Sequence, residues 1–140
     1  MRLVIATGVF ELLHPGHLMF LREARKLGER LVVIVARDST AASRKEHFFV
    51  PESQRLEVVK SLEMVDDAVL GDEDDMFRPV ERLRPDVIAL GFDQDFDEAD
   101  IEKELRRRGL KTRVVRVNAV HAGDLCGSKK IINHIREGCR

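Results

Sequence analysis

The fold of this chain is decided by residues 7–17, which read Thr7-Gly8-Val9-Phe10-Glu11-Leu12-Leu13-His14-Pro15-Gly16-His17. The apolar residues 3–6 before this stretch predict a buried β-strand. Gly8 permits a sharp turn after that strand, and Pro15 fits the first turn of a helix. A strand, a glycine turn and a helix start in this order predict a site where an anion meets free backbone amides and the positive end of a helix dipole.

Two histidines mark the predicted helix start. His14 and His17 stand three positions apart, so both imidazoles can reach one phosphate group. Zinc binding is the alternative, but two ligands are too few and no other His or Cys pair has ligand-like spacing. The stretch matches neither a G-x-G-x-x-G fingerprint nor a P-loop, which disfavours hydride transfer and P-loop hydrolysis.

Apolar runs alternate with amphipathic segments along the rest of the chain. The apolar runs predict further strands at residues 31–36, 68–70, 86–90 and 113–117. Predicted helices occupy residues 15–27, a segment beginning at Pro51, residues 76–83, a segment between a cap at Asp97 and Gly109, and the terminal segment around Ile131, Ile132 and Ile135. Residues 38–50 show no clear periodicity and are predicted to form a mobile loop beside the site.

This alternation predicts an α/β fold of the Rossmann-like, doubly wound type: a five-stranded parallel sheet with helices on both faces. The 140 residues suit one domain over residues 1–140. The net charge of −1 provides no field for nucleic acid, and no run approaches the ~20 apolar residues of a membrane span. Two cysteines indicate no disulfide framework. We therefore expect a cytoplasmic protein without nucleic-acid or membrane partners.

The central stretch also carries a family resemblance. Gly8-Val9-Phe10-Glu11-x-x-His14-x-Gly16-His17 resembles the G-T-F-D-x-x-H-x-G-H motif of the cytidylyltransferase-like nucleotidyltransferase superfamily. Val9 replaces the usual Thr and Glu11 the usual Asp. Further similarity lies in Pro51-Glu52-x-x-Arg55, in Gly91-Phe92-Asp93-Gln94, and in Cys126-Gly127-Ser128-Lys129-Lys130-Ile131, where Gly127 and Lys129 depart from the usual Ser and Thr.

The subgroup that the chain resembles most is the archaeal-type FAD synthase. The shared features are F-E-L-L-H-P-G-H, V-I-V-A-R-D-S-T, G-F-D-Q-D-F-D-E and a Cys before the Ser motif. The resemblance implies transfer of AMP from ATP to FMN, giving FAD and pyrophosphate. One alternative is a glycerol-3-phosphate cytidylyltransferase, or another enzyme that uses CTP or ATP on a small phosphorylated substrate. The second is an inactive nucleotide-binding regulatory module, to which the departures at Val9, Gly127 and Lys129 give some support, although the retention of both histidines argues against it.

The resemblance also implies roles for individual residues. The expected catalytic residues are His14, His17 and Lys45. The expected nucleotide-binding residues are Val9, Phe10, His14, Pro15, Gly16, His17, Arg55, Asp93, His121, Ser128 and Lys129. A divalent ion, Mg²⁺, would bridge the phosphates using waters and few protein ligands. The related enzymes are commonly dimers, which implies a homodimer here.

Several of these residues have simpler interpretations. Asp93 can cap a turn, Arg55 can be an exposed helix residue, and His121 can face solvent. The chain has no Trp or Tyr, so an isoalloxazine ring would rest on aliphatic side chains or on phenylalanines, for which Phe48, Phe49 and Phe96 are the candidates.

Overall fold

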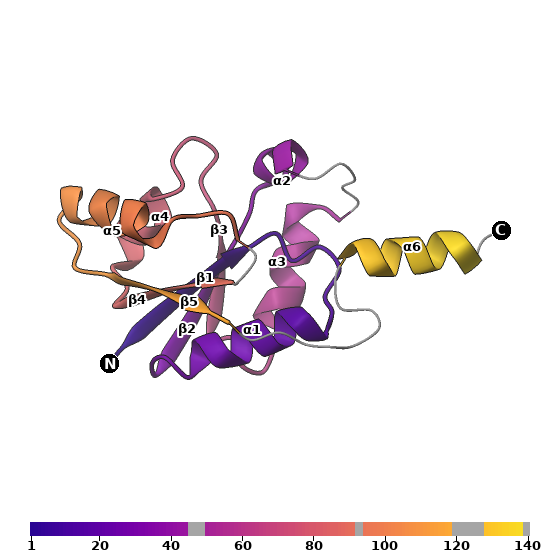
Figure 1. Ribbon diagram of the computed structural model, residues 1–140, viewed down its shortest axis with the longest axis horizontal. Helices are drawn as coiled ribbons and strands as arrows, with labels where there is room; N and C mark the ends of the chain where they lie inside the picture. Colours follow the sequence, from indigo (N-terminus) through magenta and orange to yellow (C-terminus); the bar gives the residue numbers. More distant parts are fainter. Residues whose placement is uncertain (45–49, 92–93, 119–127, 139–140) are drawn as a thin grey trace.

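The computed structural model describes residues 1–44, 50–91, 94–118 and 128–138. Its centre is a five-stranded sheet with the order β3-β2-β1-β4-β5, in which every neighbouring pair is parallel (Figure 1). The strands are β1 (Leu3–Gly8), β2 (Arg30–Val35), β3 (Asp67–Leu70), β4 (Val87–Gly91) and β5 (Arg113–Val117). The predicted five-stranded parallel sheet is confirmed, with strand boundaries that differ by one or two residues.

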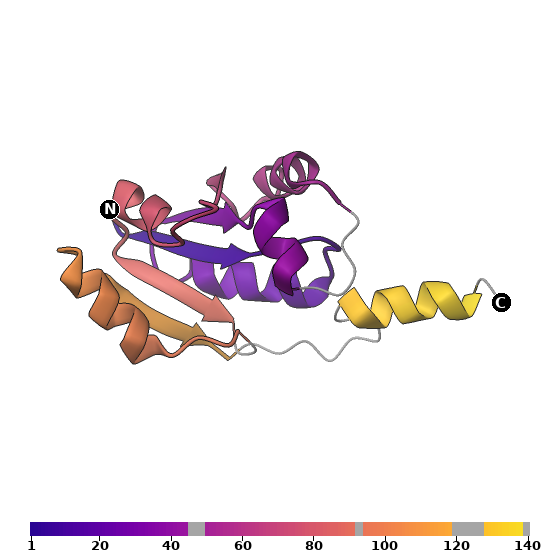
Figure 2. The same ribbon diagram turned by 90° about the horizontal axis from the view of Figure 1, so that it is seen from above.

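Helices cover both faces of the sheet, so the Rossmann-like class is also confirmed (Figure 2). The helices are α1 (Pro15–Arg25), α2 (Asp38–Arg44), α3 (Glu52–Lys60), α4 (Arg78–Leu83), α5 (Glu98–Arg107) and α6 (Ser128–Gly138). One core cluster joins α1 and α3 to the sheet through Leu21, Ala24 and Val59. The cluster on the other face joins α4 and α5 through Val80, Ile101 and Leu105.

Strand order places the site at the end of β1. The chain builds outward from β1 through β2 to β3, then returns to the other side of β1 to form β4 and β5. The crevice beyond the carboxyl ends of β1 and β4 is thus the point where the strand order reverses, which is where open α/β sheets bind ligands. In both views α6 extends away from the sheet on this side (Figures 1 and 2).

Local sequence signals account for several helix boundaries. The Asp97 side chain accepts hydrogen bonds from the backbone N–H groups of Ala99 and Asp100, which confirms the predicted cap of α5. Gly109 follows that helix with a φ of 82°, a conformation that favours glycine.

Other boundaries were predicted wrongly. Residues 38–44 form the helix α2 rather than a loop. Ala41 is buried in this short helix, and one small apolar residue is too little to give a periodic pattern. Helix α4 begins at Arg78 rather than Met76. The Asp72 carboxylate accepts from the backbone N–H groups of Asp74 and Asp75, which holds the preceding residues in turns. Pro51 lies one residue before α3, as its cap.

Candidate active site

The first turn of α1 carries the positive end of the helix dipole, and its backbone amides are already partnered, because the N–H groups of His17 and Leu18 donate to the His14 carbonyl at 3.0 and 3.3 Å. His14 caps the helix in an extended conformation, and its Nδ1 accepts a hydrogen bond of 3.2 Å from the backbone N–H of Gly16. Pro15 follows as the first helical residue. Proline has no backbone N–H, so this position leaves no unpaired donor at the helix start. The first turn carries no acidic residue that would neutralise the positive end of the helix dipole.

The two imidazoles lie against each other at this helix start. The ring centroids of His14 and His17 are 3.8 Å apart, with 32° between the ring planes. Both residues are half-buried, so the rings neither point apart nor lie sealed in the interior. Because the rings lie side by side, both can face one ligand. Their contact with a triphosphate stays a prediction.

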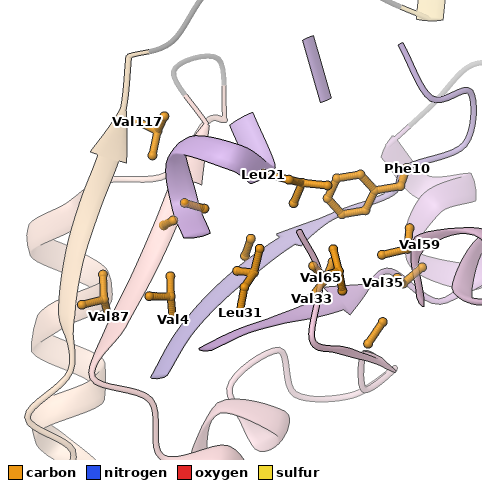
Figure 3. Packing of buried hydrophobic residues seen from close by; sticks show 14 residues of the cluster. Val4, Phe10, Leu21, Leu31, Val33, Val35, Val59, Val65, Val87 and Val117 are labelled. Carbon is orange, nitrogen blue, oxygen red and sulfur yellow. The ribbon is translucent and has the colours of Figure 1, made fainter. Parts of the chain in front are cut away.

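The buried ring of Phe10 packs against the ring of His17 on the side that faces the core. Its ring is 4% exposed, lies beside Leu21 in the core (Figure 3), and has its centroid 5.4 Å from that of the His17 ring. The backbone of Phe10 has a φ of 52°, an uncommon conformation for a residue with a side chain. A Cβ atom at Gly8 would approach the Phe10 ring to 2.8 Å. Gly8 is therefore required by close packing, and the predicted contact of Phe10 with phosphate is left to its backbone amide.

Arg55 lies inside the fold rather than on its surface. Its side chain is fully buried, which makes the alternative of an exposed helix residue wrong. Nη1 donates to the Val9 carbonyl at 2.9 Å, Nε donates to the Val50 carbonyl at 2.9 Å, and Nη2 pairs with the Asp38 carboxylate at 2.8 Å. Arg55 thus joins α3 to the loop after β1 and to the start of α2. Direct contact of Arg55 with pyrophosphate stays a prediction.

A pocket opens at the end of β1 on the face opposite α1. Its volume is about 170 Å³, and it is lined by Thr7, Gly8 and Val9 together with side chains from β2, α2, the segment after β3 and the segment after β4. Ile34 and Phe96, which belong to the core cluster of α4 and α5, and the half-exposed Met76 give it apolar walls. We call this cavity the β1-end pocket. Its volume is comparable with that of a cavity that accepts one benzene ring.

Two polar side chains that line the pocket are held by hydrogen bonds to neighbouring segments of the fold. Arg37 donates from Nε to the Gly71 carbonyl at 2.8 Å and pairs with Glu52 at 2.9 Å. Gln94 accepts from the Gly91 N–H at 2.7 Å and donates to the Thr7 carbonyl at 3.2 Å, which joins the ends of β4 and β1. These side chains therefore define a preformed cavity.

Asp72 adds a fixed negative charge to one side of the pocket. Hydrogen bonds from the backbone N–H groups of Asp75 and Asp74, and the nearby Arg78 guanidinium, hold the pKa of the Asp72 carboxyl below its ordinary value. The carboxylate is therefore ionised at neutral pH and pairs with the Arg78 guanidinium at 2.8 Å.

Several predicted residues cannot be placed. Lys45, Asp93 and His121 lie outside the described residues, as do Phe48 and Phe49, and the same applies to the side chain of Ser128. Lys129 is exposed in the first turn of α6. Of the phenylalanines predicted to contact a flavin ring, Phe96 lines the β1-end pocket.

Sequence patterns missed the pocket-lining residues Thr7, Arg37, Thr40 and Gln94. Thr7, Arg37 and Gln94 follow or end predicted strands, so their position beyond a carboxyl strand end was the available signal. Within the described part of the chain, no three His, Cys, Asp or Glu side chains converge to hold a metal ion. Among the same residues, no helix has the length and apolar character needed to cross a bilayer.

Comparison with known proteins shows the family of this chain. The cytidylyltransferase-like family model matches residues 5–134. The FAD synthase of Ferroglobus placidus is 53% identical over 96% of this chain and 88% of that protein, and the FAD synthase of Aciduliprofundum boonei is 57% identical over 92% of this chain and 87% of that protein.

Solved structures agree on the fold. The structure of a lipopolysaccharide core biosynthesis protein from Thermoplasma volcanium matches with a TM-score of 0.84 and 44% identity. The match covers 86% of this chain and 99% of that one. A pantoate-beta-alanine ligase from Francisella tularensis shares the fold at a TM-score of 0.63 and 12% identity, over 95% of this chain and 65% of that one. With a family match over most of its length and relatives that are more than half identical, this chain belongs to the cytidylyltransferase-like family of nucleotidyltransferases, in the group of the FAD synthases it matches.

Proposed function

We propose that this protein is an FMN adenylyltransferase that forms FAD and pyrophosphate from ATP and FMN. The observation that carries the proposal is the stacked pair of His14 and His17 at the first turn of α1, in a chain more than half identical to FAD synthases. In this reaction a phosphate oxygen of FMN attacks the α-phosphorus of ATP, and the bond from that phosphorus to the bridging oxygen of pyrophosphate breaks.

The proposed chemistry depends on alignment and charge stabilisation. The phosphate of FMN is largely an anion at neutral pH, because its second pKa is about 6, so no general base is needed. The His14 Nδ1 accepts from the Gly16 amide, which leaves Nε2 as the donor of a neutral ring. Nε2–H of His14 and the ring of His17 then stabilise the charge that develops on the phosphoryl oxygens.

The β1-end pocket is proposed to hold the flavin of FMN. In-line displacement requires the attacking and leaving oxygens to lie on opposite sides of the α-phosphorus. The imidazoles lie on the α1 face of the sheet, whereas the pocket lies on the α4 and α5 face, with Gly8 and Val9 at the end of β1 between them. The apolar walls of Ile34, Met76 and Phe96 suit a flat ring system, and FMN would enter with its phosphate directed toward β1.

A divalent ion, Mg²⁺, completes the proposal by neutralising charge on the phosphate oxygens. Phosphate oxygens and water would supply most of the ligands of such an ion. Removal of the ion with EDTA should abolish turnover, and added Mg²⁺ should restore it. The expected cytoplasmic location and homodimer belong to the same proposal. The molar mass of the purified protein, measured by light scattering, tests whether it is a homodimer.

The decisive experiment pairs ATP or CTP with FMN or glycerol 3-phosphate in the presence of Mg²⁺. FAD and pyrophosphate should appear with ATP and FMN. A CDP-linked product from glycerol 3-phosphate would instead establish the cytidylyltransferase alternative. Nucleotide binding without pyrophosphate release in any pairing would identify an inactive regulatory module.

A further inference from the structure

The wall of the β1-end pocket after β4 is held by one arginine of the edge strand. Arg116 lies on β5 opposite Leu90 of β4, and its side chain is 24% exposed. From Nη1 it donates to the carbonyls of Gly91 at 2.8 Å and Gln94 at 2.9 Å. From Nη2 it donates to the carbonyl of Phe96, and its Nε pairs with the Glu98 carboxylate.

These contacts gather the end of β4 and residues 94–98 around a single guanidinium. Gln94 and Phe96, whose carbonyls Arg116 binds, both line the pocket. The Gln94 side chain in turn joins this wall to the carbonyl of Thr7 at the end of β1. A short irregular segment has few contacts of its own, so its position depends on what holds its carbonyls.

Only arginine can make this set of contacts. The guanidinium is planar and carries five N–H donors in a fixed fork, whereas a lysine ammonium carries three donors at a single point. A lysine at this position can keep the ion pair with Glu98 but cannot reach three carbonyls of one turn together. Arg116 is therefore matched to the shape of the segment as well as to its charge.

We propose that Arg116 is a positioning residue that fixes the Gln94 and Phe96 wall of the β1-end pocket and thereby sets the affinity for the flavin acceptor. This inference rests on the proposed function, which places FMN in that pocket. Arg116 itself does not contact the reacting atoms. Its substitution should consequently weaken acceptor binding while leaving the chemical step intact once FMN is bound.

The test compares Arg116→Lys with Arg113→Gln. Arg113 is an exposed arginine on the same strand, three positions away and therefore on the opposite face of the sheet. FMN binding without ATP is measured by flavin fluorescence, and the kinetics are measured with both substrates. Arg116→Lys should raise the Kd and KM for FMN about tenfold and change kcat at saturating FMN by no more than about twofold. Arg113→Gln should match the parent protein.

A second readout does not depend on turnover. Amide hydrogen exchange at residues 94–98 should be faster in Arg116→Lys than in the parent protein, with exchange in α1 unchanged. Should Arg116→Lys fail to fold, Glu98→Gln provides the milder variant. It keeps an oxygen acceptor for the guanidinium but removes the charge of the ion pair, and it should raise the FMN Kd about threefold. A fold-change in this direction supports the proposal, and an unchanged FMN Kd overturns it.

Failure of the inference can be told apart from failure of the proposed function. If the parent protein makes FAD and Arg116→Lys binds FMN as tightly while only its melting temperature falls, Arg116 is structural and the inference is overturned. If the parent makes no FAD but binds FMN, and Arg116→Lys weakens that binding, the inference stands and the catalytic proposal fails. A parent protein that binds no FMN overturns both.

Discussion

The guanidinium of Arg55 donates a hydrogen bond of 2.9 Å from Nη1 to the carbonyl oxygen of Val9. The peptide bond between Val9 and Phe10 is planar and trans, so its N–H points in the direction opposite to its carbonyl. A buried side chain of α3 thus determines where the Phe10 amide points, and that amide is one of the groups proposed to hold the triphosphate. The observed role of Arg55 is to orient the loop after β1.

Loss of the Arg55 guanidinium should destabilise the protein strongly. Arg55→Met leaves the Val9 and Val50 carbonyls and the Asp38 carboxylate without this donor. We expect the free energy of unfolding to fall by about 3 kcal/mol, the size typical of removing one partner from a buried charged network. Urea unfolding measures it. Gln54→Met, at the exposed neighbouring position, should change the value by less than about 0.5 kcal/mol. Equal effects of the two substitutions would contradict the assigned network.

The histidine pair should affect turnover far more than nucleotide binding. His14→Ala and His17→Ala are each expected to lower kcat by about 10²–10³-fold, because each removes a donor to the developing charge. His134→Ala, on the exposed side of α6, is the control and should retain full activity. Steady-state kinetics and ATP binding by calorimetry separate the two effects.

The capping role of His14 needs a control of its own, because its Nδ1 also accepts from the Gly16 amide. His14→Asn keeps an acceptor for that amide but has no imidazole. It should therefore unfold like the parent protein and still lose turnover. Activity close to that of the parent in His14→Asn would reduce His14 to a helix cap.

Gly8 should tolerate no side chain. A Cβ at this position would lie 2.8 Å from two atoms of the Phe10 ring, which is itself packed in the core beside His17. Gly8→Ala should cost about 1–3 kcal/mol of stability, as overpacking does, and should displace His17 and lower kcat. Gly138→Ala is the matched control, since its Cβ would meet no atom within 4 Å. Thermal unfolding that is the same for both alanine variants would argue against this packing.

Sequence patterns predicted what depends on local order. The continuous apolar run of β2 and the cap at Asp97 are signals that neighbouring residues create, and both appear in the structure. The burial of Arg55 had no such signal, because two of its partners are backbone carbonyls that any residue would supply. No local sequence pattern indicated the β1-end pocket either. Its walls come from segments around Thr7, Ile34 and Phe96, which only the strand order brings together.

An apolar wall of the pocket can be tested without disturbing the core. Met76 lines the pocket and is 49% exposed, so Met76→Ala should leave stability nearly unchanged. The KM for FMN should rise about threefold to tenfold, because part of the apolar contact with the flavin ring is lost. Val58→Ala, equally exposed on α3, provides the control. An FMN KM that responds alike to both substitutions would remove Met76 from the acceptor site.

Stability should fall in acid because of carboxylates that bind Arg108. Glu104 pairs with Arg107 and Arg108, which lowers its pKa from 4.5 to about 2. The hydrogen bond from Arg108 likewise lowers the pKa of Asp75. A carboxyl with a folded pKa below its unfolded pKa stabilises the fold fully above the unfolded value and loses that contribution as the pH falls through the folded value. The affected window for Glu104 is therefore from about pH 4.5 down to about pH 2.

Glu104→Gln isolates this contribution. The variant has no carboxyl to protonate, so its free energy of unfolding should depend less steeply on pH between 4.5 and 2 than that of the parent protein. Glu57→Gln, at an exposed position of α3, should keep the parent slope. Urea unfolding at a series of pH values in this window measures the slopes. Parallel curves for Glu104→Gln and the parent would mean that the pairing with Arg107 and Arg108 contributes nothing to the acid sensitivity of the fold.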